Sequence, residues 1–100
     1  MADKPRIVLS VESKFPLGQL TVTAGAREAL SHDDIQTAVN SHASGDWGDL
    51  DEHDEKANER ALAEGGRLVS VYESETGSGR FYVITEADRS YTTILLPSEY

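Results

Sequence analysis

Cysteine is absent from this chain of 100 residues, and its absence excludes disulfide bridges, thiolate zinc sites and thiol nucleophiles. No run of apolar residues approaches the ~20 that a membrane-spanning helix needs. The first ten residues also lack the apolar core and the cleavage site of a signal peptide. We therefore expect a cytoplasmic protein that does not associate with a membrane.

Basic residues are scarce as well. Nine Lys and Arg residues stand against 18 Asp and Glu residues, which gives a formal net charge of −9. This charge repels a phosphate backbone, and the basic residues form no patch, so we expect no direct binding to nucleic acid. An acidic protein is attracted instead to basic proteins, including those that hold nucleic acid. The expected partner is a basic protein or a nucleoprotein complex.

The length of the chain limits it to one domain. One hundred residues bury too little surface for two cores, and a hydrophobic fraction of 38% is ordinary for a globular protein. We expect residues 1–14 to form an N-terminal arm or an additional edge strand, and residues 15–100 to form one domain. Without covalent cross-links this domain depends on a single compact core, as a monomer or a homodimer.

Capping signals predict the first of two main helices. Ser31 is a good N-cap, and Asp34 three residues later completes a capping box, so the helix covers about 32–43. Its inward stripe consists of Ile35, Ala38, Val39 and His42.

A second main helix covers about 51–64 and ends at Gly65 and Gly66. Its apolar stripe is thin and consists of Ala57, Ala61 and Leu62. Trp47, the only Trp of the chain, lies just before this helix. We expect the large side chain of Trp47 to be buried and to anchor the start of the helix.

Alternation of apolar and polar residues predicts the strands. They cover 19–23, 67–72, 80–85 and 91–96, and a short helix at 24–30 follows the first of them. Two turns join the last three strands into an antiparallel meander, and Pro97 ends the last one. The order is β-α-α-β-β-β. We expect an α+β fold in which the two main helices pack on one side of an antiparallel sheet.

Negative charge is concentrated between Asp46 and Glu64, where eight acidic and two basic residues give a charge of −6. One interpretation is a solvated helix face whose first turn is rich in acids because the helix dipole favours them. The other is a negative surface for a basic groove on another protein. The candidate partner-binding residues in this segment are Asp46, Trp47, Asp49, Asp51, Glu52, Asp54, Glu55 and Glu59.

Histidines near this segment raise the question of a metal site. His42, Asp46, Asp49 and His53 lie within twelve residues, but they lack the fixed spacing of a zinc motif. Surface or capping roles explain the histidines better. We expect no metal and no cofactor.

The predicted turn between the last two strands carries Glu86, Asp88 and Arg89. Arg89 can pair with either carboxylate and hold the turn. The same three residues can also bind a partner or a small ligand, or serve a hydrolytic enzyme. No nucleophile motif or phosphate-binding motif accompanies them, so we expect a protein that is not an enzyme.

Two long strings resemble a known family. They are GDWGDLDE (residues 45–52) and VITEADRSYTTILLPSEY (residues 83–100), accompanied by FPLG (15–18), Asn58 and GGRL (65–68). The chain resembles, over residues 15–100, a family of small uncharacterised proteins carried on bacterial plasmids and integrative elements. The turn at 77–79 is longer than is usual in that family.

The resemblance implies a mobile genetic element as the origin and supplies no activity. Mobile elements often encode small acidic proteins that disarm host defences, some by resembling nucleic acid in charge. The resemblance and the charge together suggest an inhibitor of a CRISPR or restriction complex, with a basic host protein as its partner. An accessory regulator of the element is a further alternative.

Overall fold

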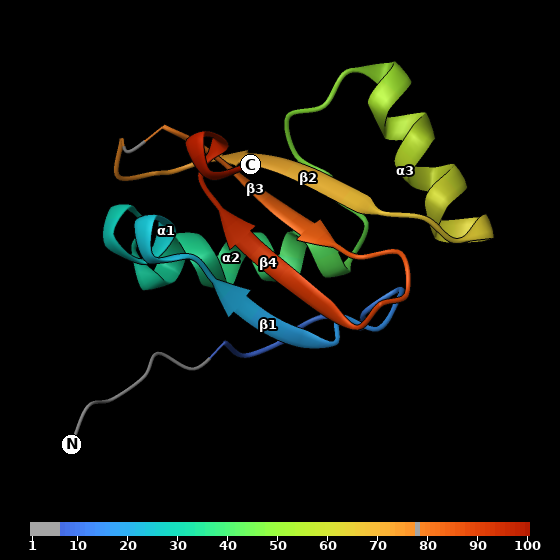
Figure 1. The fold of residues 1–100 in the computed structure, drawn as a ribbon, viewed down its shortest axis with the longest axis horizontal. Coiled ribbons are helices and arrows are strands. Elements are labelled where there is room, and N and C mark those ends of the chain that lie inside the picture. The colour runs from blue at the N-terminus through green and yellow to red at the C-terminus, as the bar shows by residue number, and fades with distance from the viewer. Residues whose placement is uncertain (1–6, 78) are drawn as a thin grey trace.

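The computed structural model describes residues 7–77 and 79–100. The chain folds as an α+β domain (Figure 1). The predicted order β-α-α-β-β-β holds for the two main helices and the strands, and the short helix after the first strand and a final 3-10 helix add to it. The elements are β1 (Gln19–Val22), α1 (Ala24–Ala29), α2 (His32–Ala43), α3 (Glu52–Glu64), β2 (Leu68–Glu73), β3 (Arg80–Thr85), β4 (Tyr91–Leu95) and the 3-10 helix η1 (Pro97–Glu99).

The sheet has the strand order β1-β4-β3-β2. Strands β2, β3 and β4 form the predicted antiparallel meander. Strand β1 pairs with β4 in parallel, so the prediction of a purely antiparallel sheet was wrong. A tight turn forces two strands to be antiparallel, whereas β1 reaches β4 only through three helices and two strands, and no turn fixes its direction.

Helices α1 and α2 cover one face of the sheet (Figure 1). The capping box at the start of α2 is confirmed, with the Asp34 amide donating to Ser31 Oγ at 3.0 Å. The four residues of the predicted α2 stripe are all buried. The main core on this face consists of Ala26, Leu30, Ile35, Ala38, Val39, Phe81, Val83 and Ile94.

Helix α3 lies beside the edge strand β2 and not on the face that carries α2, which corrects the prediction (Figure 1). Of the α3 residues, all of which the structure describes, Asn58 alone is buried, and Ala57 is exposed. The Asn58 side chain donates to the Val69 carbonyl at 2.7 Å and accepts from the Val69 amide at 3.1 Å. These bonds satisfy backbone groups that an edge strand leaves open. Two residues of the predicted stripe, Ala61 and Leu62, are half-buried and pack against a second core of Phe15, Trp47 and Leu68, so polar and apolar contacts together position this helix.

The N-terminal segment forms an arm. Residues 7–14 adopt no strand and lie along α2, where the Val8 amide donates to Gln36 Oε1 at 2.8 Å. The Ser10 amide donates to Asn40 Oδ1 at 2.7 Å. The remainder of the predicted arm, residues 1–6, lies outside the described residues.

The end of the chain is tied to the start of α1. The Glu99 carboxylate accepts hydrogen bonds from the Thr23 hydroxyl at 2.6 Å, the Leu96 amide at 2.9 Å and the Gly25 amide at 3.2 Å. These donors, the Thr23 hydroxyl first, lower the pKa of Glu99. Among the described residues no helix is both long and apolar enough to cross a bilayer.

Candidate functional site

Trp47 holds the loop that leads into α3, and its predicted burial is confirmed at 4% exposure. The indole stacks on Phe15, with ring centroids 6.2 Å apart, and meets the edge of His42 at 5.7 Å. Its Nε1–H donates to Glu59 Oε2 at 2.8 Å. Trp47 therefore connects the core to α3, and this burial removes it from the set of residues that can face a partner.

The loop around Trp47 continues as a short bridge against β2. The Val71 amide donates to the Trp47 carbonyl at 3.1 Å, and the Asp49 amide donates to the Val71 carbonyl at 2.7 Å. Gly48 has φ +80°, and a Cβ there would lie 2.1 Å from the Val71 oxygen. The glycine is therefore required by this close approach, which covers the β2 edge next to Asn58.

A chain of buried polar side chains links α2 to the sheet. His42 Nδ1 lies 2.6 Å from Ser70 Oγ, and His42 Nε2 lies 2.8 Å from Thr85 Oγ1. Thr85 Oγ1 lies 2.6 Å from Thr92 Oγ1, and Thr92 donates to the Leu17 carbonyl at 2.7 Å. The four side chains are 0% exposed, so the predicted surface or capping role was wrong for His42. This network belongs to the core and offers no surface to a ligand.

One proton arrangement satisfies this network. The single Thr92 hydroxyl hydrogen goes to Leu17, so Thr85 must donate to Thr92 and accept from His42 Nε2–H. His42 Nδ1 then accepts from the Ser70 hydroxyl. Burial, together with the positive charge of Arg89, lowers the pKa of His42 to about 3. His42 is therefore a neutral, Nε2-protonated core residue.

Arg89 fixes the far end of α3. The residue has φ +61° and its guanidinium donates to the Ala61 carbonyl at 3.1 Å, the Gly66 carbonyl at 2.5 Å and the Glu86 carbonyl at 3.0 Å. It also lies over the Phe15 ring, 5.8 Å from the centroid. Arg89 was predicted to pair with carboxylates, but it donates to main-chain carbonyls instead. Carbonyl groups at a helix C-terminus interact favourably with a cation. Arg89 therefore joins α3 to the β3–β4 turn.

The two carboxylates of that turn also have nearby partners. Glu86 accepts from Arg67 Nη2 at 3.3 Å, and Asp88 accepts from the Ser90 hydroxyl at 2.6 Å. The Ser90 hydroxyl and amide lower the pKa of Asp88. The turn thus brings the three predicted residues together as a hydrogen-bonded structure.

The seven predicted acidic residues of the Asp46–Glu64 segment are all exposed. Two of them form exposed ion pairs, Asp49 with Arg80 at 2.6 Å and Glu52 with Lys56 at 3.1 Å. Such pairs contribute little to stability. The spacing of Glu52, Glu55 and Glu59 places them on one stripe of α3. We call this exposed set, Asp46, Asp49, Asp51, Glu52, Asp54, Glu55 and Glu59, the acidic face.

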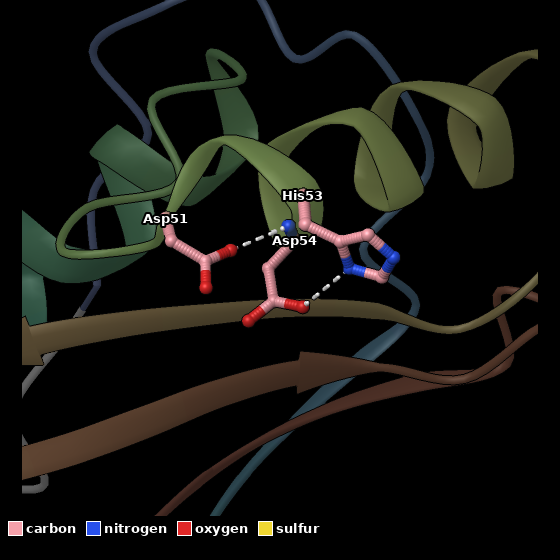
Figure 2. Close-up of side chains that lie close together, drawn as sticks. All are labelled: Asp51, His53 and Asp54. Carbon is pink, nitrogen blue, oxygen red and sulfur yellow. Dashed lines mark hydrogen bonds and ion pairs between the residues drawn. The ribbon is translucent and has the colours of Figure 1, made fainter.

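Three side chains at the start of α3 lie close enough together to hold a metal ion (Figure 2). Ligand atoms of Asp51, His53 and Asp54 lie within 4.8 Å of one another, and all three residues are exposed. Asp51 is the N-cap of α3 and accepts from the Asp54 amide at 2.8 Å, while His53 Nδ1 lies 3.5 Å from Asp54 Oδ1. Helix capping explains this group. The structure separates the four residues of the earlier metal hypothesis, because His42 lies in the core and His53 on the surface.

A groove of about 370 Å³ runs between α3 and the sheet face that points away from α2. Phe81 and Val83 face α2, so Tyr82 between them points into the groove. The groove is lined by Leu50, Asp54, Ala57, Asn58, Arg67, Val69, Val71, Tyr82 and Tyr100.

Sequence reasoning missed the groove, the role of Asn58 and the network around His42. The groove and the role of Asn58 depend on where α3 lies, and the apolar stripe of α3 did not reveal its position. The network had a signal. His42 belonged to the predicted inward stripe, and Ser70, Thr85 and Thr92 occupy positions that alternation assigns to the inward face of their strands.

No family model, no curated protein and no solved structure matches this chain, so the resemblance described above stays a prediction.

Proposed function

We propose that this chain is a non-catalytic protein-binding module whose acidic face binds a basic protein surface. The proposal rests on the exposure of α3. Asn58 is its one buried residue, and Glu52, Asp54, Glu55 and Glu59 are exposed to solvent. Ala61 and Leu62 pack against Phe15, Trp47 and Leu68, but the rest of the helix surface is polar or exposed and gains little from its own domain. A partner that covers it would supply the missing contacts.

The fixed position of α3 supports recognition by charge. The Asp51 cap holds its start, the Trp47–Glu59 hydrogen bond holds its middle, and Arg89 holds its C-terminal end. Because the backbone that carries the carboxylates is already ordered, binding costs less conformational entropy than it would for a flexible acidic tail. Opposite charge on a partner would steer the encounter.

The partner class follows from charge and from the family resemblance. A net charge of −9 disfavours nucleic acid and favours a basic host protein or nucleoprotein complex. We propose an anti-defence inhibitor from a mobile genetic element, acting in the cytoplasm on a CRISPR or restriction complex by resembling nucleic acid in charge. If the protein is instead an accessory regulator of the element, the same acidic face would bind a different partner.

The alternative function is a small-ligand site or a hydrolytic enzyme at the turn of Glu86, Asp88 and Arg89. Arg89 already donates to four main-chain carbonyls, and Asp88 accepts from Ser90. A ligand that recruited these groups would have to break the contacts that hold the end of α3. Within the acidic face Asp51 and Glu59 also hold α3, but the pair of Glu52 with Lys56 is exposed and costs little to break. The acidic face is therefore the better-supported site.

A capture experiment from a host lysate tests the proposal. The acidic-face variant combines Glu52→Gln, Glu55→Gln and Glu59→Gln, and the matched control combines Glu12→Gln, Glu28→Gln and Glu75→Gln. Both variants lose three exposed carboxylates, so they have the same net charge. We expect a protein that the wild-type chain and the control capture and the acidic-face variant loses. Equal capture by all three chains would contradict the proposal.

A further inference from the structure

The groove beside α3 combines an apolar floor with one acidic wall. Val71 is 8% exposed, and Val69 and Tyr82 are half-buried. A side chain from another protein can therefore contact the floor of the groove. Asp54 of the acidic face lines the wall, next to Ala57. A volume of about 370 Å³ lies at the low end of ligand pockets, which suits one large side chain and not a whole helix.

An exposed aromatic side chain extends this surface. Tyr100 lines the groove, is 69% exposed and packs edge-on against Tyr82, with ring centroids 5.7 Å apart. Aromatic residues are enriched at the centres of protein interfaces. The exposed Tyr100 and the groove together form a surface suited to a protein partner.

Charge determines which partner segment fits the groove. Arg67, the one basic lining residue, is paired with Glu86 and donates to Tyr100 Oη at 3.4 Å, so its charge is partly compensated. On the wall, Asp54 lies 3.5 Å from His53 Nδ1 and Glu52 pairs with Lys56 at 3.1 Å, but the segment from Asp46 to Glu64 keeps a charge of −6, from eight acidic and two basic residues. The wall therefore attracts cationic residues and the floor attracts an apolar one.

We propose that the groove binds one aromatic side chain of a partner segment whose flanking residues are Lys or Arg. This inference rests on the proposed function, because the acidic face supplies the complementary charge. The aromatic ring lies on Val69 and Val71 against Tyr82, and the flanking cations lie along α3. The groove thus selects among basic partners, which charge alone does not distinguish.

Titration of the ¹⁵N-labelled chain with two synthetic peptides tests this inference. Both are Lys-rich peptides of about twelve residues, one with a central Trp and one with Ser at that position. We expect the Trp peptide to bind at least about tenfold more tightly and to shift the amide signals of Val69, Val71 and Tyr82.

Two matched variants locate the binding. Ala57→Phe fills the groove, and Ala63→Phe places the same side chain at an exposed α3 position that does not line it. We expect only the first to remove the preference for the Trp peptide. Circular dichroism checks that both variants keep their helices.

The outcomes separate this inference from the proposed function. Equal, salt-sensitive binding of the two peptides would overturn the inference and leave the acidic face as a binding surface. A Trp preference that survives Ala57→Phe would also overturn it. Failure of both peptides to bind would overturn it, while a captured basic partner would still support the proposed function.

Discussion

Acid should destabilise this protein through His42, in a pH range above the one in which its perturbed carboxylates titrate. Burial, reinforced by the charge of Arg89, lowers the pKa of His42 from 6.5 to about 3. Between these two values the unfolded chain binds a proton that the folded chain excludes. Stability is therefore complete above pH 6.5 and falls as the pH drops toward 3.

The magnitude follows from the size of the shift. Each unit below pH 6.5 removes up to about 1.4 kcal/mol, so the free energy of unfolding at pH 5 should be about 2 kcal/mol lower than at pH 8. The pKa values of Asp34, Asp88 and Glu99 are lowered from ordinary values of 3.8 to 4.5, so these groups contribute only at lower pH. Such a loss is a large share of the stability of a small domain.

Urea denaturation at pH 8 and pH 5 measures this loss, with the fluorescence of the buried Trp47 as the signal. A control chain with His32→Gln and His53→Gln, both at exposed positions, should lose as much stability as the wild type. The ¹⁵N shifts of the His42 ring should show an Nε2-protonated neutral imidazole down to about pH 4. The reasoning is refuted if the control chain loses its pH dependence or if the His42 ring titrates near pH 6.5.

Three substitutions test the contacts that position α3. Trp47→Ala should cost about 3–5 kcal/mol in the free energy of unfolding, measured by urea denaturation followed by circular dichroism, because it empties a buried site; an unchanged midpoint would mean that the indole is exposed. Asn58→Ala should cost about 1–3 kcal/mol and speed hydrogen exchange of the Val69 amide, which loses its acceptor; unchanged exchange would contradict that contact. Arg89→Lys should cost about 2 kcal/mol, because an ammonium group cannot reproduce the fork that reaches Ala61, and faster hydrogen exchange at the end of α3 is the check.

Local signals in the sequence predicted the parts of the fold that depend on neighbouring residues. The capping box of Ser31 and Asp34 set the start of α2, and alternation set the meander. The burial of Trp47 followed from its size. For the capping box and the meander, the residues that decide the structure lie within a few positions of one another or on adjacent strands.

Long-range contacts explain what the sequence did not predict. The direction of β1 depends on pairing with β4, seventy residues later in the chain, which no local turn specifies. Ala61 and Leu62 of the predicted stripe do pack on the domain, but the side of the sheet on which α3 lies depends also on the Asn58 amide bonding to the β2 backbone, and apolar periodicity cannot detect a polar contact. Arg89 was expected to pair with carboxylates, but carbonyls at the end of α3 accept from it instead. The groove exists only because α3 lies beside the sheet in this position.

The most direct test of the acidic face is the salt dependence of association with the captured partner. The association rate constant of the wild-type chain should fall steeply as salt rises from about 0.05 to 0.5 M, because screening shortens the range of attraction to a few ångströms. The variant with Glu52→Gln, Glu55→Gln and Glu59→Gln should show a shallower slope, and the control with Glu12→Gln, Glu28→Gln and Glu75→Gln should follow the wild type. A rate constant that is indifferent to salt and equal in all three chains would contradict binding through the acidic face.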